Sequence, residues 1–205
     1  MIDKKQSGSV HSMANTSGKR NESDFYQTPY SLTQKLLNRE YFDKNKIILE
    51  PCCGKGAILK VLNDNEYNCK GYDINDDNHI DFLEQKDKIP YIITNPPFRL
   101  AKEFILHMKE VVEEKFALLL PLNYLHGKER YDIIWNDNNF KLKNIFVLTR
   151  YPLLTQDIRE DGKYKTGMMV YAWYVWDKQY KDKPYIEWID NNEDVINAKE
   201  TKDNV

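Results

Sequence analysis

The stretch KIILEPCCGKGAILKVLND, residues 46–64, contains a strand pattern, a turn and a helix pattern in succession. Residues 46–50 form a short apolar run typical of a buried strand, and residues 57–64 carry apolar side chains at helical spacing. The segment between them contains Gly54 and Gly56, which permit a tight turn and let a ligand approach the backbone closely. This order predicts the first half of a βαβ unit.

Segments of the same two kinds alternate along the rest of the chain. Further strands are expected at 70–74, 91–94, 115–122, 143–149 and 168–176, and further helices at 100–114 and 128–137. Alternation of strands and helices indicates parallel pairing, because each right-handed crossover needs a helix to cover the sheet. The sequence therefore predicts an α/β fold with a mostly parallel, doubly wound sheet, in which ligands bind beyond the carboxyl ends of the strands.

The two ends of the chain differ in composition from its middle. Residues 1–23 are rich in Ser, Asn, Lys and Gly and are expected to form a flexible polar arm, and residues 191–205 a polar tail. The length of 205 residues and the apolar segments in between predict a single domain over residues 24–190.

The composition excludes several classes of protein. The 30 basic and 32 acidic residues give a net charge of −2, so a nucleic-acid partner must be met by a local basic patch. No apolar run is long enough to span a bilayer, and the polar N-terminus does not resemble a secretory signal. Cys52, Cys53 and Cys69 lack the CxxC spacing of zinc sites, so no metal is expected. The odd cysteine count favours a reducing compartment and hence a cytoplasmic location.

Acidic side chains stand at the ends of the first two predicted strands. Glu50 would repel a phosphate and attract an ammonium or sulfonium group, and Leu59 occupies the third position of an incomplete dinucleotide fingerprint. These features favour a cationic, nucleoside-like cofactor, with a plain tight turn as the alternative. Asp73 follows at the distance expected of an acid that accepts hydrogen bonds from two ribose hydroxyls, with a turn-capping surface Asp as the alternative.

The pair Asp81-Phe82 follows a few residues later. Its carboxylate could accept a hydrogen bond from an adenine amino group while its ring covers the face of the base. A helix cap next to a core phenylalanine explains the same pair equally simply. Both interpretations stay open at this point.

The third strand of this half ends in the stretch YIITNPPF, residues 91–98. Asn95 precedes a proline and is restricted to extended geometry, and Pro96 and Pro97 have no N–H group. The corner therefore offers two acceptors, the Asn95 side-chain oxygen and the Pro96 carbonyl, with the Phe98 ring beside them. This combination suits a planar ring that carries an exocyclic NH₂ group, whereas the simpler alternative is a proline-rich turn.

The segments EPCCGKG, GYDI, IDFLE and TNPPF, in this order, resemble the S-adenosylmethionine-dependent amino-methyltransferases, most closely those that act on adenine N6 in DNA. The upstream segment DFYQTP and the pair Lys165-Thr166 before the strand YAWYVW resemble small phage and prophage members. The resemblance spans residues 24–177 and implies a Rossmann-like class I methyltransferase fold with an antiparallel hairpin strand near the C-terminus. For a phage-encoded enzyme, the location would be the host cytoplasm.

The resemblance also implies roles for individual residues. The catalytic residues would be Asn95, Pro96, Pro97 and Phe98. S-adenosylmethionine, which is converted to S-adenosylhomocysteine, would contact Tyr26, Gln27, Thr28, Pro29, Glu50, Pro51, Cys52, Gly54, Gly56, Asp73, Ile74, Asp81, Phe82 and Asn95. Two acceptors that hold the hydrogens of N6 would free its lone pair to attack the sulfonium methyl, after the base has been flipped out of the duplex.

The chain leaves little room for a separate target-recognition domain. Candidate substrate contacts are the loop Asn123–Arg130 and the stretch that contains Arg150, Arg159, Lys163 and Lys165, with a solvated loop as the alternative. DNA is the favoured partner. Enzymes that methylate adenine or guanine in RNA, or a protein glutamine, carry similar tetrapeptides and are the first alternative. An inactive methyltransferase-like binding subunit is the second alternative. A dehydrogenase is disfavoured by the incomplete glycine fingerprint.

Overall fold

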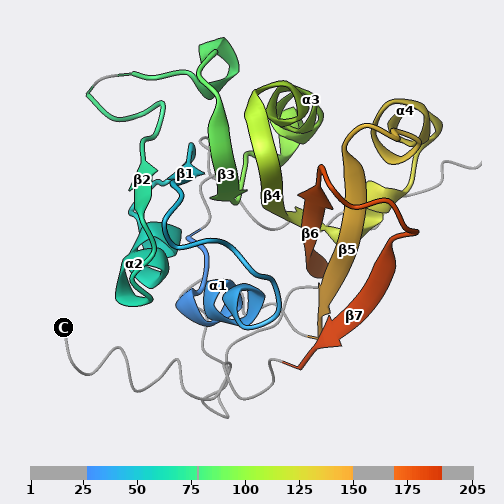
Figure 1. Cartoon of the computed structure of the whole chain (residues 1–205), viewed down its shortest axis with the longest axis horizontal. Coiled ribbons are helices and arrows are strands. Elements are labelled where there is room, and N and C mark those ends of the chain that lie inside the picture. Colours follow the sequence, from blue (N-terminus) through green and yellow to red (C-terminus); the bar gives the residue numbers. More distant parts are fainter. Residues whose placement is uncertain (1–26, 78, 150–168, 191–205) are drawn as a thin grey trace, which may run out of the picture.

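A computed structural model describes residues 27–77, 79–149 and 169–190 of the protein, and it contains a seven-stranded sheet flanked by helices (Figure 1). The strands are β1 (Ile48–Glu50), β2 (Cys69–Gly71), β3 (Ile89–Thr94), β4 (Val112–Pro121), β5 (Lys141–Leu148), β6 (Tyr171–Asp177) and β7 (Tyr185–Ile189). Their order across the sheet is β2-β1-β3-β4-β6-β5-β7. The predicted arm, the predicted tail and residues 24–26 lie outside the described residues.

The strands of the first half of the chain run parallel. β1 pairs in parallel with both β2 and β3, and β3 pairs in parallel with β4. β6 lies between β4 and β5 and is antiparallel to both, whereas the edge strand β7 is parallel to β5. The prediction of a mostly parallel sheet with an antiparallel hairpin strand near the C-terminus is confirmed.

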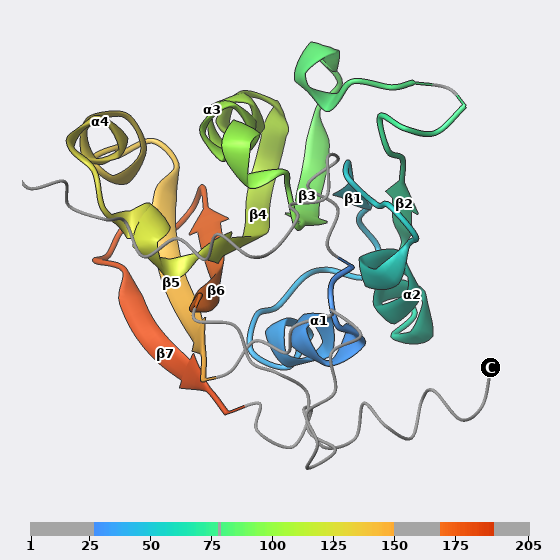
Figure 2. The same ribbon diagram turned by 180° about the vertical axis from the view of Figure 1, so that it is seen from behind.

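Helices cover both faces of the sheet, as a doubly wound fold requires. α1 (Tyr30–Leu37) and α2 (Ala57–Asp64) lie on one face, and α3 (Ala101–Val111) and α4 (Lys128–Arg130) lie on the other (Figures 1 and 2). α4 continues into a π-helical turn at Tyr131–Trp135, so the helix predicted at 128–137 is present but irregular. None of the helices in the described ranges is both long and apolar enough to cross a membrane.

The sequence of the central strand β4 is apolar at successive positions, and its place in the sheet explains why. Successive strand side chains point to opposite faces, and here both faces are covered. Leu118 and Leu120 pack with Met108 in the core beneath α3. Ala117 and Leu119 pack in the second core, with the buried side chains of α1 and α2. The sheet is thus enclosed between two hydrophobic layers.

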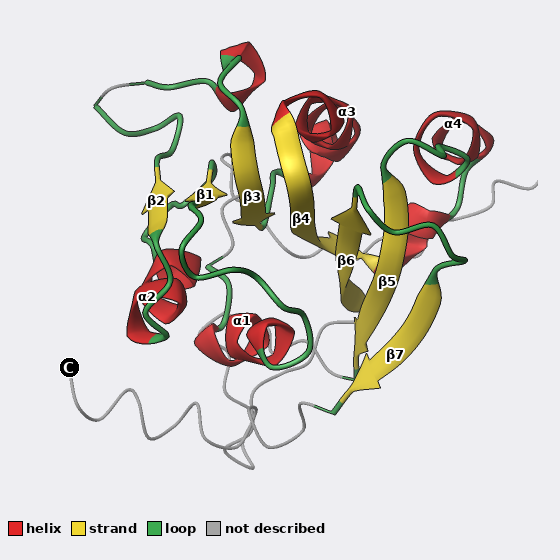
Figure 3. Cartoon of the chain, viewed as in Figure 1, coloured by secondary structure: helices red, strands yellow, loops and turns green. Residues whose placement is uncertain are grey.

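The helix α1 and the strand β7 were not predicted from the sequence. α1 is short and contains a polar Thr-Gln-Lys run, so its apolar stripe is brief. β7 places Tyr185, Ile186 and Trp188 in exposed positions at the edge of the sheet, so its sequence lacks the pattern of a half-buried strand. The strand predicted at 70–74 ends already at Gly71, and a long loop connects β2 to β3 (Figure 3).

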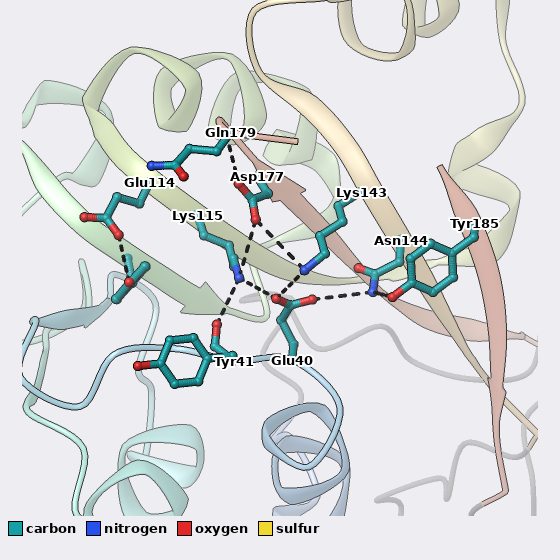
Figure 4. A network of polar contacts seen from close by, with 10 residues as sticks. Glu40, Tyr41, Glu114, Lys115, Lys143, Asn144, Asp177, Gln179 and Tyr185 are labelled. Carbon is teal, nitrogen blue, oxygen red and sulfur yellow. Dashed lines mark hydrogen bonds and ion pairs between the residues drawn. The ribbon is translucent and has the colours of Figure 1, made fainter. Parts of the chain in front are cut away.

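A buried polar network joins the segment after α1 to the second half of the sheet (Figure 4). The Glu40 carboxylate, 2% exposed, accepts hydrogen bonds from Lys115 of β4 and from Lys143 of β5, the latter at 2.8 Å. Asn144 is also buried and donates to the Tyr185 hydroxyl of β7 at 2.7 Å. Lys115 lies near the start of β4, so the network is at the opposite end of the sheet from the carboxyl ends of the parallel strands.

Candidate active site

A cavity of about 510 Å³ lies beyond the carboxyl ends of β1, β2 and β3, within the size range of small-molecule sites. The position is the one that a parallel, doubly wound sheet predicts. The predicted site residues that line it are Gln27, Thr28, Glu50, Pro51, Cys52, Asp73, Ile74, Asp81, Phe82, Asn95, Pro96, Pro97 and Phe98. Pro29, Gly54 and Gly56 are not among its lining residues, and Tyr26 lies outside the described residues.

The glycine turn between β1 and α2 requires its glycines. Gly54 has φ of 49° and Gly56 has φ of 75°, both in the left-handed region that other residues rarely adopt. Gly56 is the N-cap of α2, and its N–H donates to the Cys53 carbonyl at 2.7 Å. Both glycines therefore shape the wall of the cavity through the backbone without lining it.

Glu50 places a buried carboxyl group at the end of β1. It is 2% exposed, and its Oε2 accepts a hydrogen bond from the Leu59 N–H in the first turn of α2 at 3.0 Å. Burial raises the pKa of Glu50 to about 9, and the nearby charge of Asp73 acts in the same direction. The carboxyl group therefore holds a proton at neutral pH, and a cation beside it would favour the ionised form.

Asp73 connects the end of β2 to the glycine turn. Its Oδ2 accepts a hydrogen bond from the Gly54 N–H at 3.0 Å. Its Oδ1 accepts one from the Asn75 N–H at 3.0 Å and one from the Asn75 side-chain Nδ2 at 2.8 Å. The turn-capping alternative therefore describes an actual role of Asp73. A carboxylate has about four lone-pair sites, so these three bonds leave acceptor capacity on Oδ2 of a group that lines the cavity.

The Asp81-Phe82 pair also has the structural role that was left open. Asp81 accepts a hydrogen bond from the Leu83 N–H at 2.9 Å and begins a short 3₁₀ helix. Phe82 is 3% exposed, and its ring lies 5.2 Å from that of Phe104 and 4.9 Å from that of His107. Both residues still line the cavity, so a structural role and a ligand contact are compatible.

The corner at residues 95–98 makes two tertiary contacts that its sequence did not indicate. The Asn95 side chain donates from Nδ2 to the Thr28 hydroxyl oxygen at 3.2 Å, and Thr28 is buried in the segment before α1. The Phe98 ring lies 5.7 Å from the ring of Tyr171 at the start of β6. Asn95 and Phe98 are thus each held by a segment distant in sequence.

The two thiols of the glycine segment are not nucleophiles in this environment. Burial raises the pKa of Cys52, and it raises the pKa of Cys53 to about 11. Both therefore stay protonated at neutral pH, and the thiol is the unreactive form. Within the described ranges no group of histidine, cysteine and acidic side chains could hold a metal ion.

Further lining residues were missed from the sequence. Cys53 and Lys55 adjoin the predicted glycine residues, and Arg99 directly follows the NPPF corner, so proximity along the chain was their available signal. Phe104 has the helical spacing of a core residue, and nothing in that spacing separates a core position from a cavity wall. Its exposure to the cavity depends on where α3 begins.

Of the two segments predicted to contact the substrate, the loop Asn123–Arg130 lies within the described residues. In the loop after β4, Arg130 donates to the His126 carbonyl, from Nε at 2.9 Å, and its guanidinium lies 4.7 Å from the Tyr124 ring. Arg130 is therefore engaged within its own loop. The second predicted set lies outside the described residues and comprises Arg150, Arg159, Lys163 and Lys165.

No protein-family model and no curated protein sequence matches the chain, but solved structures share its fold. A protein assigned as the modification subunit of a type I restriction enzyme from Vibrio vulnificus aligns with a TM-score of 0.53 at 14% identity, over 86% of this chain and 48% of that one. The chain thus spans about half the length of that protein. The 23S rRNA methyltransferase ErmE aligns with a TM-score of 0.51 at 10% identity, over 77% of this chain and 71% of that one.

A third structure extends the comparison. A protein from Listeria monocytogenes, assigned as a class I S-adenosylmethionine-dependent methyltransferase, aligns with a TM-score of 0.50 at 16% identity, over 84% of this chain and 67% of that one. At such identities the likeness concerns the fold. Together with the sheet order and the antiparallel β6, it shows that the chain has the class I S-adenosylmethionine-dependent methyltransferase fold.

Proposed function

We propose that the protein transfers a methyl group from S-adenosylmethionine to the exocyclic N6 amino group of adenine in DNA. The observation that carries the proposal is the convergence of three strand ends on one cavity. Glu50 follows β1, Asp73 follows β2 and the Asn95–Phe98 corner follows β3, and all of them line the same space. One half of the cavity offers acids suited to a cationic nucleoside, and the other offers acceptors and a ring suited to an amino-bearing base.

The chemistry of the cavity fits this cofactor. Glu50 is a buried carboxyl group that a neighbouring positive charge would shift to its ionised form, so it would lose its proton on binding the amino group of the methionine part. Asp73 would use the remaining acceptor site of its Oδ2 for a ribose hydroxyl, and Asp81 and Phe82 would contact the adenine. Gln27, Thr28, Pro51, Cys52 and Ile74 would complete the walls. When bound, S-adenosylmethionine supplies a methyl group on a positively charged sulfur.

The residues of the corner would prepare the target nitrogen. In adenine the N6 lone pair is delocalised into the ring, which makes the nitrogen a poor nucleophile. The Asn95 side-chain oxygen and the Pro96 carbonyl would accept hydrogen bonds from the two amino hydrogens and favour a tetrahedral nitrogen. Phe98 would stack on the flipped base and replace about 1–3 kcal/mol of lost stacking. The prolines hold these acceptors in place before the substrate arrives.

The target nitrogen is proposed to belong to DNA. DNA is favoured by the resemblance of the ordered motifs to adenine-N6 methyltransferases. RNA or a protein glutamine is the first alternative, because each offers a nitrogen next to an sp² carbon. ErmE, which shares the fold, is by name an rRNA methyltransferase. An inactive binding subunit would keep the cavity without the transfer.

The test is a parallel transfer assay with methyl-labelled cofactor on DNA, RNA and protein, followed by identification of the methylated nucleoside or residue. Label in N6-methyladenine from DNA supports the proposal, and label in RNA or protein moves it to one of the alternatives. Asn95→Ala is the matched control, because it removes one acceptor and leaves the acids of the cofactor half in place. We expect this variant to keep cofactor affinity within about threefold and to lose nearly all transfer.

Calorimetry provides the second measurement. Wild-type protein that binds no S-adenosylmethionine would reject the proposed function outright. Cofactor binding without transfer to any polymer would favour the binding subunit.

A further inference from the structure

We infer that Arg99 binds the phosphate beside the target base, so that the cavity accepts a nucleotide rather than a glutamine side chain. The inference rests on the proposed function and deepens it, because it names the chemical class of the acceptor. The resemblance gave no role to Arg99, which directly follows the Asn95–Phe98 corner.

Along the corner, the chain runs from the interior of the cavity to its mouth. Pro96 is buried, Phe98 is partly buried and Arg99 is exposed, and all three line the cavity. A short 3₁₀ turn, Phe98–Leu100, connects the corner to α3. An exposed residue that lines a cavity lies at its mouth, so Arg99 places a positive charge at the entrance on the side of the corner.

A nucleotide bound in this cavity would have its parts in the same order. The proposed contacts hold the amino group at Asn95 and Pro96 and the ring at Phe98. The sugar follows the ring and the phosphate follows the sugar, because a flipped base turns about its backbone and enters the pocket alone. The phosphate therefore stays at the mouth of the cavity, beside Arg99.

The guanidinium group of Arg99 is available for such a ligand. Within the described ranges, the Arg99 side chain takes part in no hydrogen bond and in no ion pair. By contrast, Lys102 in the first turn of α3 donates to Glu129 at 2.9 Å. A guanidinium presents a rigid fork of N–H donors that matches the oxygens of a phosphate, and such pairs are frequently bidentate.

The charges of the other lining residues sharpen the choice of acceptor. Asp73 and Asp81 line the cavity and would repel a phosphate, and the net charge of −2 gives the chain no general attraction for one. Lys55 lines the cavity from the glycine turn, on the side of the cofactor. A glutamine side chain has no phosphate and would leave Arg99 without a partner. Arg99 therefore favours a nucleotide over a protein glutamine.

The experiment combines a substitution in the protein with a substitution in the acceptor. The acceptor is a short piece of the polymer that the parallel transfer assay labels, made once with ordinary phosphates and once with neutral methylphosphonates on both sides of the target base. Arg99→Ala removes the guanidinium, and Arg99→Lys keeps the charge without the fork. Lys55→Ala is the matched control, because it removes a positive charge from the same cavity on the side of the cofactor. Each protein is measured for kcat/KM with both acceptors and for cofactor affinity.

Arg99→Ala is expected to lower kcat/KM for the ordinary acceptor about 10- to 100-fold, because a charge-assisted hydrogen bond to the phosphate is lost. The neutral acceptor should cost the wild type a similar factor, and with that acceptor the wild type and Arg99→Ala should agree within about twofold. Arg99→Lys should lie between the two proteins with the ordinary acceptor. Lys55→Ala should lose the same factor with both acceptors, and Arg99→Ala should keep its cofactor affinity within about threefold.

One result would overturn the inference and leave the proposed function in place. It is transfer to a nucleic acid in which Arg99→Ala loses no activity, or loses the same factor with the ordinary and the neutral acceptor. Label that appears only in protein would overturn the inference and move the function to glutamine. A wild type that labels no polymer would remove the proposed function and the inference with it.

Discussion

The substitution Glu50→Gln separates two effects of the buried Glu50 carboxyl group. One is its effect on the free energy of unfolding, and the other is its contribution to cofactor binding. Gln keeps the shape of the side chain and an oxygen that can accept from the Leu59 N–H, but it cannot ionise. The pKa of Glu50 is about 9 in the folded protein, against an ordinary value of 4.5. A raised carboxyl pKa contributes stability that is complete below pH 4.5 and is lost progressively as the pH rises towards 9.

The size of this loss follows from the two pKa values. Between them the unfolded chain releases a proton from Glu50 that the folded protein keeps, so the wild type loses about 1.4 kcal/mol of unfolding free energy per pH unit. At pH 7 the loss amounts to about 3 kcal/mol, and from pH 5 to pH 8 it changes by about 4 kcal/mol. Glu50→Gln lacks this loss, so the variant should become progressively more stable than the wild type as the pH rises.

The assay is urea unfolding of both proteins at pH 5, 6, 7 and 8 without cofactor. Glu113→Gln, at an exposed position of β4, controls for the loss of one negative charge. A stability difference between Glu50→Gln and the wild type that stays constant with pH would refute the reasoning. Although Glu50→Gln should be the more stable protein, it should bind S-adenosylmethionine more weakly than the wild type. Cofactor binding by the wild type at pH 7 should release a proton, which calorimetry in buffers of different ionisation enthalpy detects.

Other perturbations test the rest of the site and the fold. Asp73→Ala should weaken cofactor binding and, through the lost bonds to the Gly54 N–H and to Asn75, lower unfolding free energy by about 1–2 kcal/mol; unchanged affinity in calorimetry would remove the ribose assignment. Phe98→Ala should weaken substrate binding by about 1–3 kcal/mol with unaltered cofactor affinity, and Phe98→Trp should restore it in a titration with oligonucleotide. Glu40→Ala should cost up to about 3–5 kcal/mol in urea unfolding, because it removes the buried carboxylate that binds Lys115 and Lys143 and leaves the buried Lys115 with the more distant Asp177. Breaking the exposed Arg39–Glu187 pair by Arg39→Ala should cost about 1 kcal/mol or less, and equal costs for the two would contradict a buried network.

Local sequence patterns predicted most of the strands and helices of the fold. Apolar runs predicted the parallel strands β1, β3 and β4, because a strand buried on both faces needs apolar side chains at every position. The glycine turn followed from the φ values that only glycine adopts readily, and both glycines have them. The edge strand β7 escaped prediction, because its exposed Ile186 and Trp188 follow no burial pattern.

The candidate site also has features that the sequence predicts and features that depend on the tertiary structure. The sequence by itself determined which groups stand at the carboxyl ends of the strands: Glu50, Asp73 and the Asn95–Phe98 corner. It did so because a strand end is a local feature, and parallel strands bring their ends to one edge. Only the tertiary structure decided how these groups are held and charged. The Thr28 hydroxyl on Asn95, the Tyr171 ring beside Phe98 and the raised pKa of Glu50 all depend on segments that meet only when the sheet is assembled, and hydrogen bonding and desolvation are set by those neighbours.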